Sequence, residues 1–188
     1  IIDRLEEAVK KYHPRAVYVI PDFNNPTGVS LSTCRRVDLT NLSKLHDFIL
    51  ISDDAYQMLS YTDTSSQAMG TLVDAGNVVS LGTFSKILAP GFRVGWIQSS
   101  HILIEKIRET GWLNSGGSVS HFGSQIVRHG LESGQQEKHL QYLLRCYRSR
   151  VTAMNDALLH YLGNELTWEK PLGGYFFWLA LFHQGQLH

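Results

Sequence analysis

Three short apolar runs alternate with amphipathic segments in the first half of the chain. Each run is bounded by polar or turn-forming residues, which is typical of a buried strand. The segments before the first two runs carry apolar residues three and four positions apart, which indicates helices, and Ser32 is placed to cap the one that ends near His46. This alternation predicts a three-layer α/β/α fold around a mainly parallel sheet. The three predicted strands are Ala16–Ile20, Phe48–Ser52 and Val78–Leu81.

The second half of the chain is predicted to be mostly helical. A fourth apolar run, Arg93–Gln98, follows the third too closely for a helical crossover, so we expect it to lie antiparallel to that strand. Helices are predicted after a cap at Ser100 and over 119–131. From about Gln136 to Tyr161 the apolar positions step by three and four, which predicts one long helix.

The end of the chain combines a Gly-Gly pair with an apolar segment. Trp168–Ala180 predicts a turn followed by a strand, with no later element to cover it. We expect residues 1–145 to form part of a large domain. Residues 146–188 are expected to form a connecting helix and the start of a smaller α+β domain. A chain that opens inside a helix and ends on an uncovered strand is expected to be a piece of a longer protein.

Composition disfavours several classes of function. The 188 residues carry 17 basic and 17 acidic side chains, so bulk charge gives no support to nucleic-acid or membrane-surface binding. The two cysteines are far apart, and the nine histidines show no metal-ligand spacing, so we expect neither a disulfide framework nor a metal site. No Gly-Lys-Ser/Thr phosphate loop occurs. No leader and no long apolar run are visible, which predicts a cytoplasmic chain.

Polar clusters follow the first three predicted strands at their carboxyl ends. They are Asn25-Pro-Thr-Gly28, Asp53-Asp54-Ala-Tyr56 and Thr83-Phe-Ser85-Lys86, the last with Arg93 seven residues beyond the lysine. Ligands of open parallel sheets bind at this edge. Hydroxyls and a guanidinium suit a phosphate, and a lysine in a partly desolvated pocket is a usable nucleophile. Taken singly, these residues also fit surface charges, turn residues or loop carboxylates, and either Asp53 or Asp54 fits the last reading.

Together the three clusters resemble the signature of pyridoxal-phosphate-dependent aminotransferases of fold type I. The spacing of Lys86 to Arg93, the Ala89-Pro-Gly91 turn and the Pro171-x-Gly-Gly-Tyr-Phe-Phe-Trp178 segment are most similar to the kynurenine/2-aminoadipate branch. The resemblance runs from about Pro14 to Ala180. It implies a small C-terminal domain after the large cofactor domain.

The resemblance also implies a role for each residue. Lys86 would form a Schiff base with the aldehyde of pyridoxal 5'-phosphate and then act as general base. Asp53, which the spacing to Tyr56 selects over Asp54, would pair with the pyridine nitrogen. Tyr56 and Asn25 would hydrogen-bond the phenolate oxygen of the ring, and Asn25 would also reach the substrate carboxylate.

The phosphate of the cofactor is expected to lie against Thr83, Ser85 and Arg93. Thr83 stands where the family usually has serine, which keeps the hydroxyl. The resemblance implies that two parts of the family's site lie outside this sequence: the N-terminal third, with its aromatic ring that stacks on the cofactor, and the C-terminal arginine that clamps the substrate carboxylate. We therefore expect this chain alone to bind the cofactor weakly and to transaminate poorly. Gly173, Gly174 and Tyr175 are interpreted either as the border of the substrate side chain or as a plain tight turn.

The leading functional hypothesis is transfer of an amino group between an α-amino acid and a 2-oxo acid, in a homodimer. A lyase or decarboxylase of the same fold would share every residue named above. A third hypothesis is the ligand-sensing domain of a transcriptional regulator, since similar domains follow a winged-helix DNA-binding domain. A basic helix-turn-helix upstream would favour the regulator, and a substrate-domain arm with a stacking aromatic would favour the enzyme.

Overall fold

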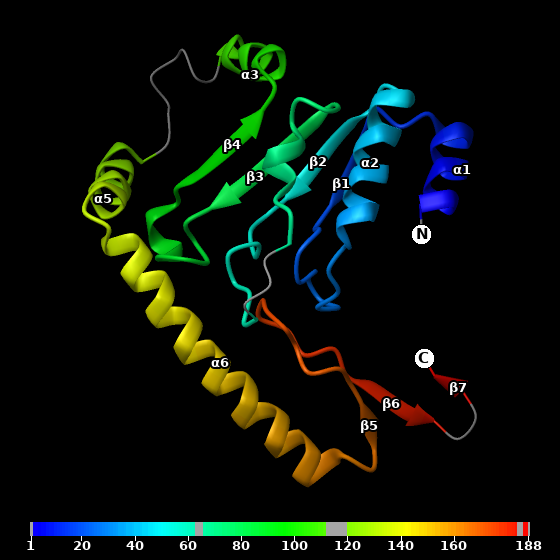
Figure 1. Cartoon of the computed structure of the whole chain (residues 1–188), viewed down its shortest axis with the longest axis vertical. Helices are drawn as coiled ribbons and strands as arrows, with labels where there is room; N and C mark the ends of the chain where they lie inside the picture. Colours follow the sequence, from blue (N-terminus) through cyan, green and yellow to red (C-terminus); the bar gives the residue numbers. More distant parts are fainter. Residues whose placement is uncertain (1, 63–65, 112–119, 184–185, 188) are drawn as a thin grey trace.

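A four-stranded sheet forms the centre of the first half of the molecule. The computed structural model describes the chain except residues 1, 63–65, 112–119, 184–185 and 188. The strand order is β1-β2-β3-β4, in which the first three strands are parallel and β4 is antiparallel to β3 (Figure 1). Both predicted orientations are confirmed. The strands are β1 Ala16–Val19, β2 Ile49–Asp53, β3 Val78–Thr83 and β4 Gly95–Ser99.

The α-helices lie where the apolar periodicity predicted, and α2 connects β1 to β2, whereas the described residues of the next two connections of the sheet contain only short 3-10 turns. Ser32 caps α2, where its side chain accepts a hydrogen bond from the backbone N–H of Arg35. Ser100 precedes α3 without a side-chain cap. The helices are α1 Ile2–Tyr12, α2 Thr33–Leu45, α3 His101–Arg108, α5 His121–Glu132 and α6 Gln135–Leu162, with 3-10 turns η1 Met69–Leu72 and η2 Pro90–Phe92.

Two apolar clusters hold these elements together. The first packs α1 and α2 against β2, β3 and η1, and the second packs α5 and the start of α6 against the segments that follow β2 and β3. Burial in the first cluster is complete at Phe48, Leu50 and Val78. The strand β1 differs from the prediction of a fully buried strand, because it is an edge of the described sheet and alternates exposed and half-buried residues.

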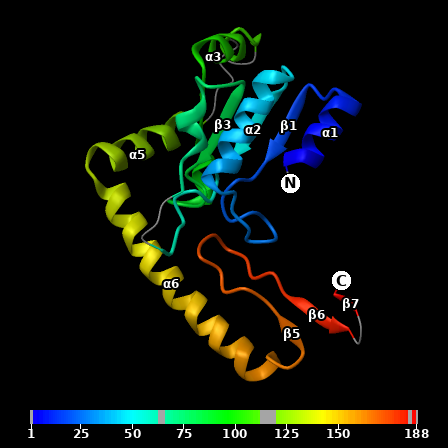
Figure 2. The ribbon, with the colours of Figure 1, turned by 45° about the vertical axis from the view of Figure 1, so that its right-hand side comes forward.

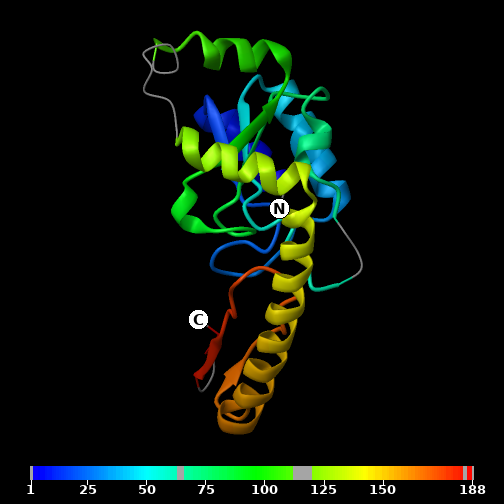
Figure 3. The ribbon, with the colours of Figure 1, turned by 90° about the vertical axis from the view of Figure 1, so that its left-hand side faces the viewer.

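The predicted long helix is one continuous element of 28 residues. In Figure 1 it leads from α5 beside the first sheet to a second sheet, and Figure 3 shows it running alongside that sheet. The second sheet has order β5-β6-β7 and is antiparallel, with β5 Leu166–Thr167, β6 Ala180–His183 and β7 Gln186–Leu187. The boundary between residues 145 and 146 stays a prediction.

The strand predicted within Trp168–Ala180 begins only at Ala180. The preceding residues are held instead by contacts with the segment after β2, where Gly173 forms an isolated bridge with Ser60 and Tyr61 N–H donates to the carbonyl of Leu172. No helix in the described part of the chain is long and apolar enough to cross a membrane.

Candidate active site

The carboxyl ends of β1, β2 and β3 bring the predicted residues to one edge of the sheet. The loop after β1 carries Asn25, β2 ends on Asp53, and β3 ends on Thr83 just before Lys86. In Figure 2 the turn after β1 faces the C-terminal segment, and the segments after β2 and β3 pack against α5 and the start of α6. The parallel register places the three polar clusters side by side, as the sequence predicted.

Lys86 lies beside two tyrosine rings that contact each other edge to face. Its Nζ is 6.0 Å from the ring centroid of Tyr56 and 5.7 Å from that of Tyr175. Cation–π attraction at this range favours an ammonium group held over the ring faces. Tyr56 is a predicted neighbour, whereas Tyr175 comes from the far end of the chain. The half-buried lysine therefore has an aromatic neighbour from each half of the molecule.

The adjacent carboxylates Asp53 and Asp54 have different surroundings. Asp53 Oδ2 accepts a hydrogen bond from the hydroxyl of Tyr18 at 2.6 Å, and its Oδ1 accepts one from the backbone N–H of Ala55 at 3.2 Å. Asp54 is buried between strands and accepts hydrogen bonds from the hydroxyls of Ser52 and Ser80. Burial raises the pKa of Asp54. Of the two, only Asp53 keeps a half-exposed carboxylate toward the site.

Tyr56 and Asn25 come together from different strands. Burial and the charge of Asp53 raise the pKa of Tyr56, and a hydrogen bond with the side chain of Asn25 acts in the opposite direction. The phenol therefore stays protonated near neutral pH and can donate to an oxygen of a ligand. This pairing is the one that the resemblance implied for the phenolate side of the cofactor ring.

The predicted phosphate residues also converge. Arg93 Nη1 lies 3.4 Å from Ser85 Oγ and 3.2 Å from the carbonyl oxygen of Pro90, and the Ser85 N–H donates to Thr83 Oγ1 at 3.1 Å. Arg93 adopts a left-handed backbone conformation with φ 53°, which is rare outside glycine. Its guanidinium and the two hydroxyls form a set of donors that fits a phosphate.

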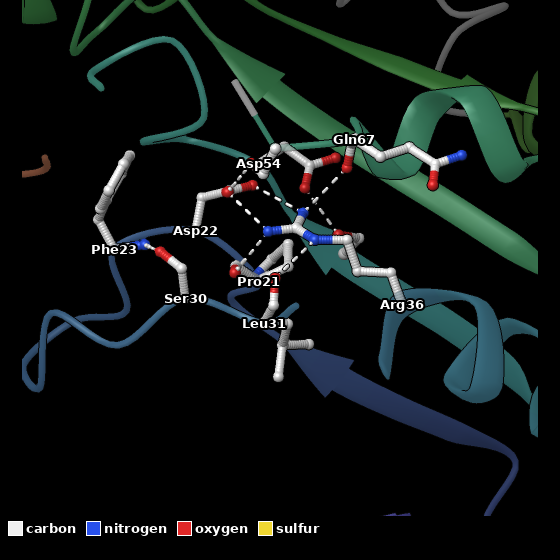
Figure 4. A network of polar contacts seen from close by, with 10 residues as sticks. Pro21, Asp22, Phe23, Ser30, Leu31, Arg36, Asp54 and Gln67 are labelled. Carbon is white, nitrogen blue, oxygen red and sulfur yellow. Dashed lines mark hydrogen bonds and ion pairs between the residues drawn. The ribbon is translucent and has the colours of Figure 1, made fainter. Parts of the chain in front are cut away.

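The loop that carries Asn25 is fixed by a buried ion pair that the sequence analysis missed. Arg36 of α2 binds Asp22 with both terminal nitrogens, at 2.7 and 2.9 Å, and both side chains are at most 1% exposed. Figure 4 shows the guanidinium surrounded by oxygens from three segments. It also donates to the carbonyls of Pro21, Leu31 and Gln67. Both ends of the loop are thereby attached to one side chain.

The C-terminal segment reaches the lysine through Tyr175. The Tyr175 hydroxyl donates to the backbone carbonyl of Lys86 at 2.8 Å. Just before it, Gly174 has φ 70°, and a Cβ on Gly173 would lie 2.3 Å from the ring of Phe23. Close packing therefore requires glycine at both positions. The contact of Tyr175 with Lys86 favours the interpretation that this segment borders the site over that of a plain tight turn.

Tyr18, Asp22 and Arg36 are the polar residues that sequence reasoning did not single out. Tyr18 stands in an apolar run, and its relation to Asp53 follows only from the pairing of β1 with β2, in which Tyr18 lies opposite Ile51. Arg36 follows Arg35 directly, and no sequence pattern distinguishes the buried arginine from the exposed one.

The described residues include no cluster of three or more histidine, cysteine or acidic side chains that could hold a metal ion.

A model of the family described as aminotransferase class I and II matches residues 1–186. The chain belongs to this family. The resemblance that the three polar clusters carried is thus confirmed, and with it the fold class, since solved structures of aminotransferases match this chain in shape.

Relatives of two kinds match this chain. Aromatic-amino-acid aminotransferase 1 of Thermococcus litoralis is 35% identical over 185 residues, which cover 96% of this chain and 44% of that protein. The uncharacterized HTH-type transcriptional regulator YisV of Bacillus subtilis is 34% identical over 175 residues, which cover 93% of this chain and 36% of that protein.

A solved structure shares the fold closely. Kynurenine aminotransferase of Pyrococcus horikoshii, solved with PMP, superposes with a TM-score of 0.87 at 34% identity and covers 97% of this chain and 46% of that one. The chain thus spans less than half the length of the relatives it matches.

Proposed function

We propose that this chain carries the lysine side of the active site of a pyridoxal-phosphate-dependent aminotransferase. The observation that carries the proposal is the gathering of Lys86, Asp53, the Asn25–Tyr56 pair and the Arg93 donors at one sheet edge. This donor set fits the cofactor's chemistry, with an amine for an aldehyde, a carboxylate for a pyridine nitrogen, and a guanidinium with hydroxyls for a phosphate. When bound, the cofactor supplies the electron sink for the reaction.

The residues of this chain then have separate tasks. Lys86 would hold the cofactor through its aldehyde carbon, with loss of water, and its amine, once released by an amino acid, would take the proton from the substrate Cα. Asp53 would hold the pyridine nitrogen in its protonated form, and Tyr56 with Asn25 would donate to the ring oxygen. Thr83, Ser85 and Arg93 would hold the phosphate.

We further propose amino acids with aromatic or long apolar side chains as substrates, together with a 2-oxo acid. A cavity of about 510 Å³ beside Tyr175 supports this assignment, because its lining is mostly apolar. It is lined by Tyr61, Tyr147, Val151, Met154, Tyr175 and Phe177, among others. The names of the aromatic-amino-acid and kynurenine aminotransferases agree with this substrate class. Dimerisation stays a prediction of the family resemblance, and a cytoplasmic location stays a prediction from the sequence.

A regulator remains the second candidate, because YisV matches this chain almost as well as the aminotransferase does. Both functions use the same lysine edge, so the chain outside these residues decides between them. Conversion of an added amino acid to its 2-oxo acid favours the enzyme, and cofactor-dependent binding of operator DNA without turnover favours the regulator.

The first experiment is borohydride reduction of the full-length protein with pyridoxal phosphate, followed by peptide mass mapping. We expect a single adduct on Lys86, lost in Lys86→Ala and kept in Lys44→Ala, which removes an exposed amine of α2. Labels scattered over several lysines in the full-length protein would show that the cofactor assignment is wrong.

A further inference from the structure

Tyr18 is a polar contact of the site that the proposed roles leave unused. It lies in β1, where it pairs in register with Ile51 of β2. Asp53 is two residues beyond Ile51, so it projects from the same face of the sheet one step further along. The 2.6 Å hydrogen bond from the Tyr18 hydroxyl to Asp53 Oδ2 spans this diagonal and joins residues 35 positions apart.

The ring of Tyr18 does not serve the apolar core. The residue is 58% exposed, and it belongs to neither apolar cluster. The pairing is therefore a weak source of folding stability, since exposed polar contacts contribute little. Its strongest effect is on the carboxylate that it contacts, because hydrogen bonds to an ionised acceptor are short and directional.

The carboxylate of Asp53 is held at both oxygens. Oδ1 accepts from the Ala55 N–H within its own turn, and Oδ2 accepts from Tyr18 of the neighbouring strand. The backbone contact alone leaves rotation about the side chain, whereas two donors from different elements fix the plane of the carboxylate. Partial burial and the hydrogen bond to Asp53 raise the pKa of Tyr18 to about 12, so its hydroxyl stays a donor throughout the neutral range.

We propose that Tyr18 is a positioning residue that orients the Asp53 carboxylate toward the ring nitrogen of the cofactor. The inference rests on the proposed function, since it assigns Asp53 to that nitrogen. In this arrangement Tyr18 and the nitrogen share one carboxylate, and loss of the hydroxyl leaves Asp53 free to turn away. The effect of such an outer hydrogen bond on ligand affinity is about tenfold.

The pair can be tested first without cofactor, in the full-length protein labelled with ¹³Cζ-tyrosine. Tyr18→Phe identifies the Tyr18 signal, and Tyr12→Phe, which removes an exposed hydroxyl of α1, is the matched control. At neutral pH we expect Asp53→Asn to move the Tyr18 signal toward that of Tyr12, because the charged acceptor is lost. An unmoved signal would mean that the two side chains are not paired.

The role is tested with ¹⁵N-labelled pyridoxal phosphate bound to the same proteins. We expect Tyr18→Phe to shift the ¹⁵N frequency of the ring nitrogen, to weaken cofactor binding about tenfold and to lower kcat with little change in KM. Tyr12→Phe should change none of these. If Tyr18→Phe matches the control in frequency and affinity, the positioning role is wrong even though Lys86 binds the cofactor. If no adduct forms on Lys86 in the unmodified protein, the proposed function itself fails.

Discussion

Two polar clusters lie on either side of the end of β2, and they differ in how much hydrogen-bonding capacity their side chains keep for a ligand. The buried cluster consists of Asp22, Arg36, Asp54, Ser52 and Ser80. Its carboxylates and guanidinium are matched by partners within the chain, with Arg36 alone contacting Asp22 and three backbone carbonyls. Such a cluster has little capacity left for a ligand, which is why we assign it to structure.

The open cluster consists of Tyr18, Asn25, Asp53, Tyr56 and Lys86. Its groups touch one another but are half-exposed or exposed, apart from the buried Tyr56, and the lysine amine faces two rings. The two clusters are adjacent in sequence, since Asp53 and Asp54 belong to different ones. The contrast teaches that residue type alone does not separate the carboxylate proposed for the site from its buried neighbour, whereas exposure at the carboxyl edge of the sheet does.

Breaking the buried cluster should have the largest effect. Arg36→Met leaves the Asp22 carboxylate buried without its counter-charge and releases three carbonyls, so we expect a loss of about 3–5 kcal/mol in the free energy of unfolding. Urea denaturation of the full-length protein measures it. Arg35→Met, at an exposed position one residue earlier, is the matched control and should change stability by less than about 0.5 kcal/mol. Equal losses in the two variants would remove the distinction between buried and exposed arginine.

A smaller loss is expected where the C-terminal segment packs against the loop of the open cluster. A Cβ on Gly173 would meet the Phe23 ring at 2.3 Å and the Leu59 carbonyl oxygen at 2.5 Å, and the carbonyl cannot move aside freely. We expect Gly173→Ala to cost about 1–3 kcal/mol in the free energy of unfolding. Because Tyr175 lies two residues on, the same variant should weaken labelling of Lys86 by pyridoxal phosphate.

Gly111→Ala is the control for that experiment, since a Cβ there has no neighbour within 4 Å. It should leave both unfolding and Lys86 labelling unchanged. Tolerance of alanine at both positions would contradict the close packing of the segment on Phe23.

The sequence predicted the sheet, the cap at Ser32, the long helix and the three polar clusters, because periodicity and turn residues act locally. It also favoured Asp53 over Asp54 by spacing to Tyr56, and the hydrogen bonds of the two carboxylates agree. It did not separate Arg36 from Arg35, nor relate Tyr18 to Asp53 or Tyr175 to Lys86. Those pairs are 35 and 89 residues apart, and they exist only after strands and segments have been placed in register.

The smallest expected effect concerns Asp54, the carboxyl of the buried cluster whose pKa is raised. Burial raises the pKa of Asp54, and hydrogen bonds from Ser80 and Ser52 oppose that shift only in part. A carboxyl with a raised pKa binds its proton more tightly in the folded than in the unfolded state. Its contribution to stability is therefore present at low pH and is lost as the pH rises through the folded-state pKa.

Asp54→Asn, which cannot ionise, should accordingly gain stability relative to the unmodified protein as the pH rises from about 4 to 7. The gain should be of the order of one net hydrogen bond, about 1 kcal/mol. Urea midpoints at both pH values measure it, with Asp74→Asn as the control for removing an exposed carboxylate. If Asp54→Asn instead loses stability as the pH rises, or follows the control, then Asp54 is held as an anion by its two serines. Asp54 would then carry a charge in the folded protein, and the two clusters would differ only in whether solvent or a ligand can reach their carboxylates.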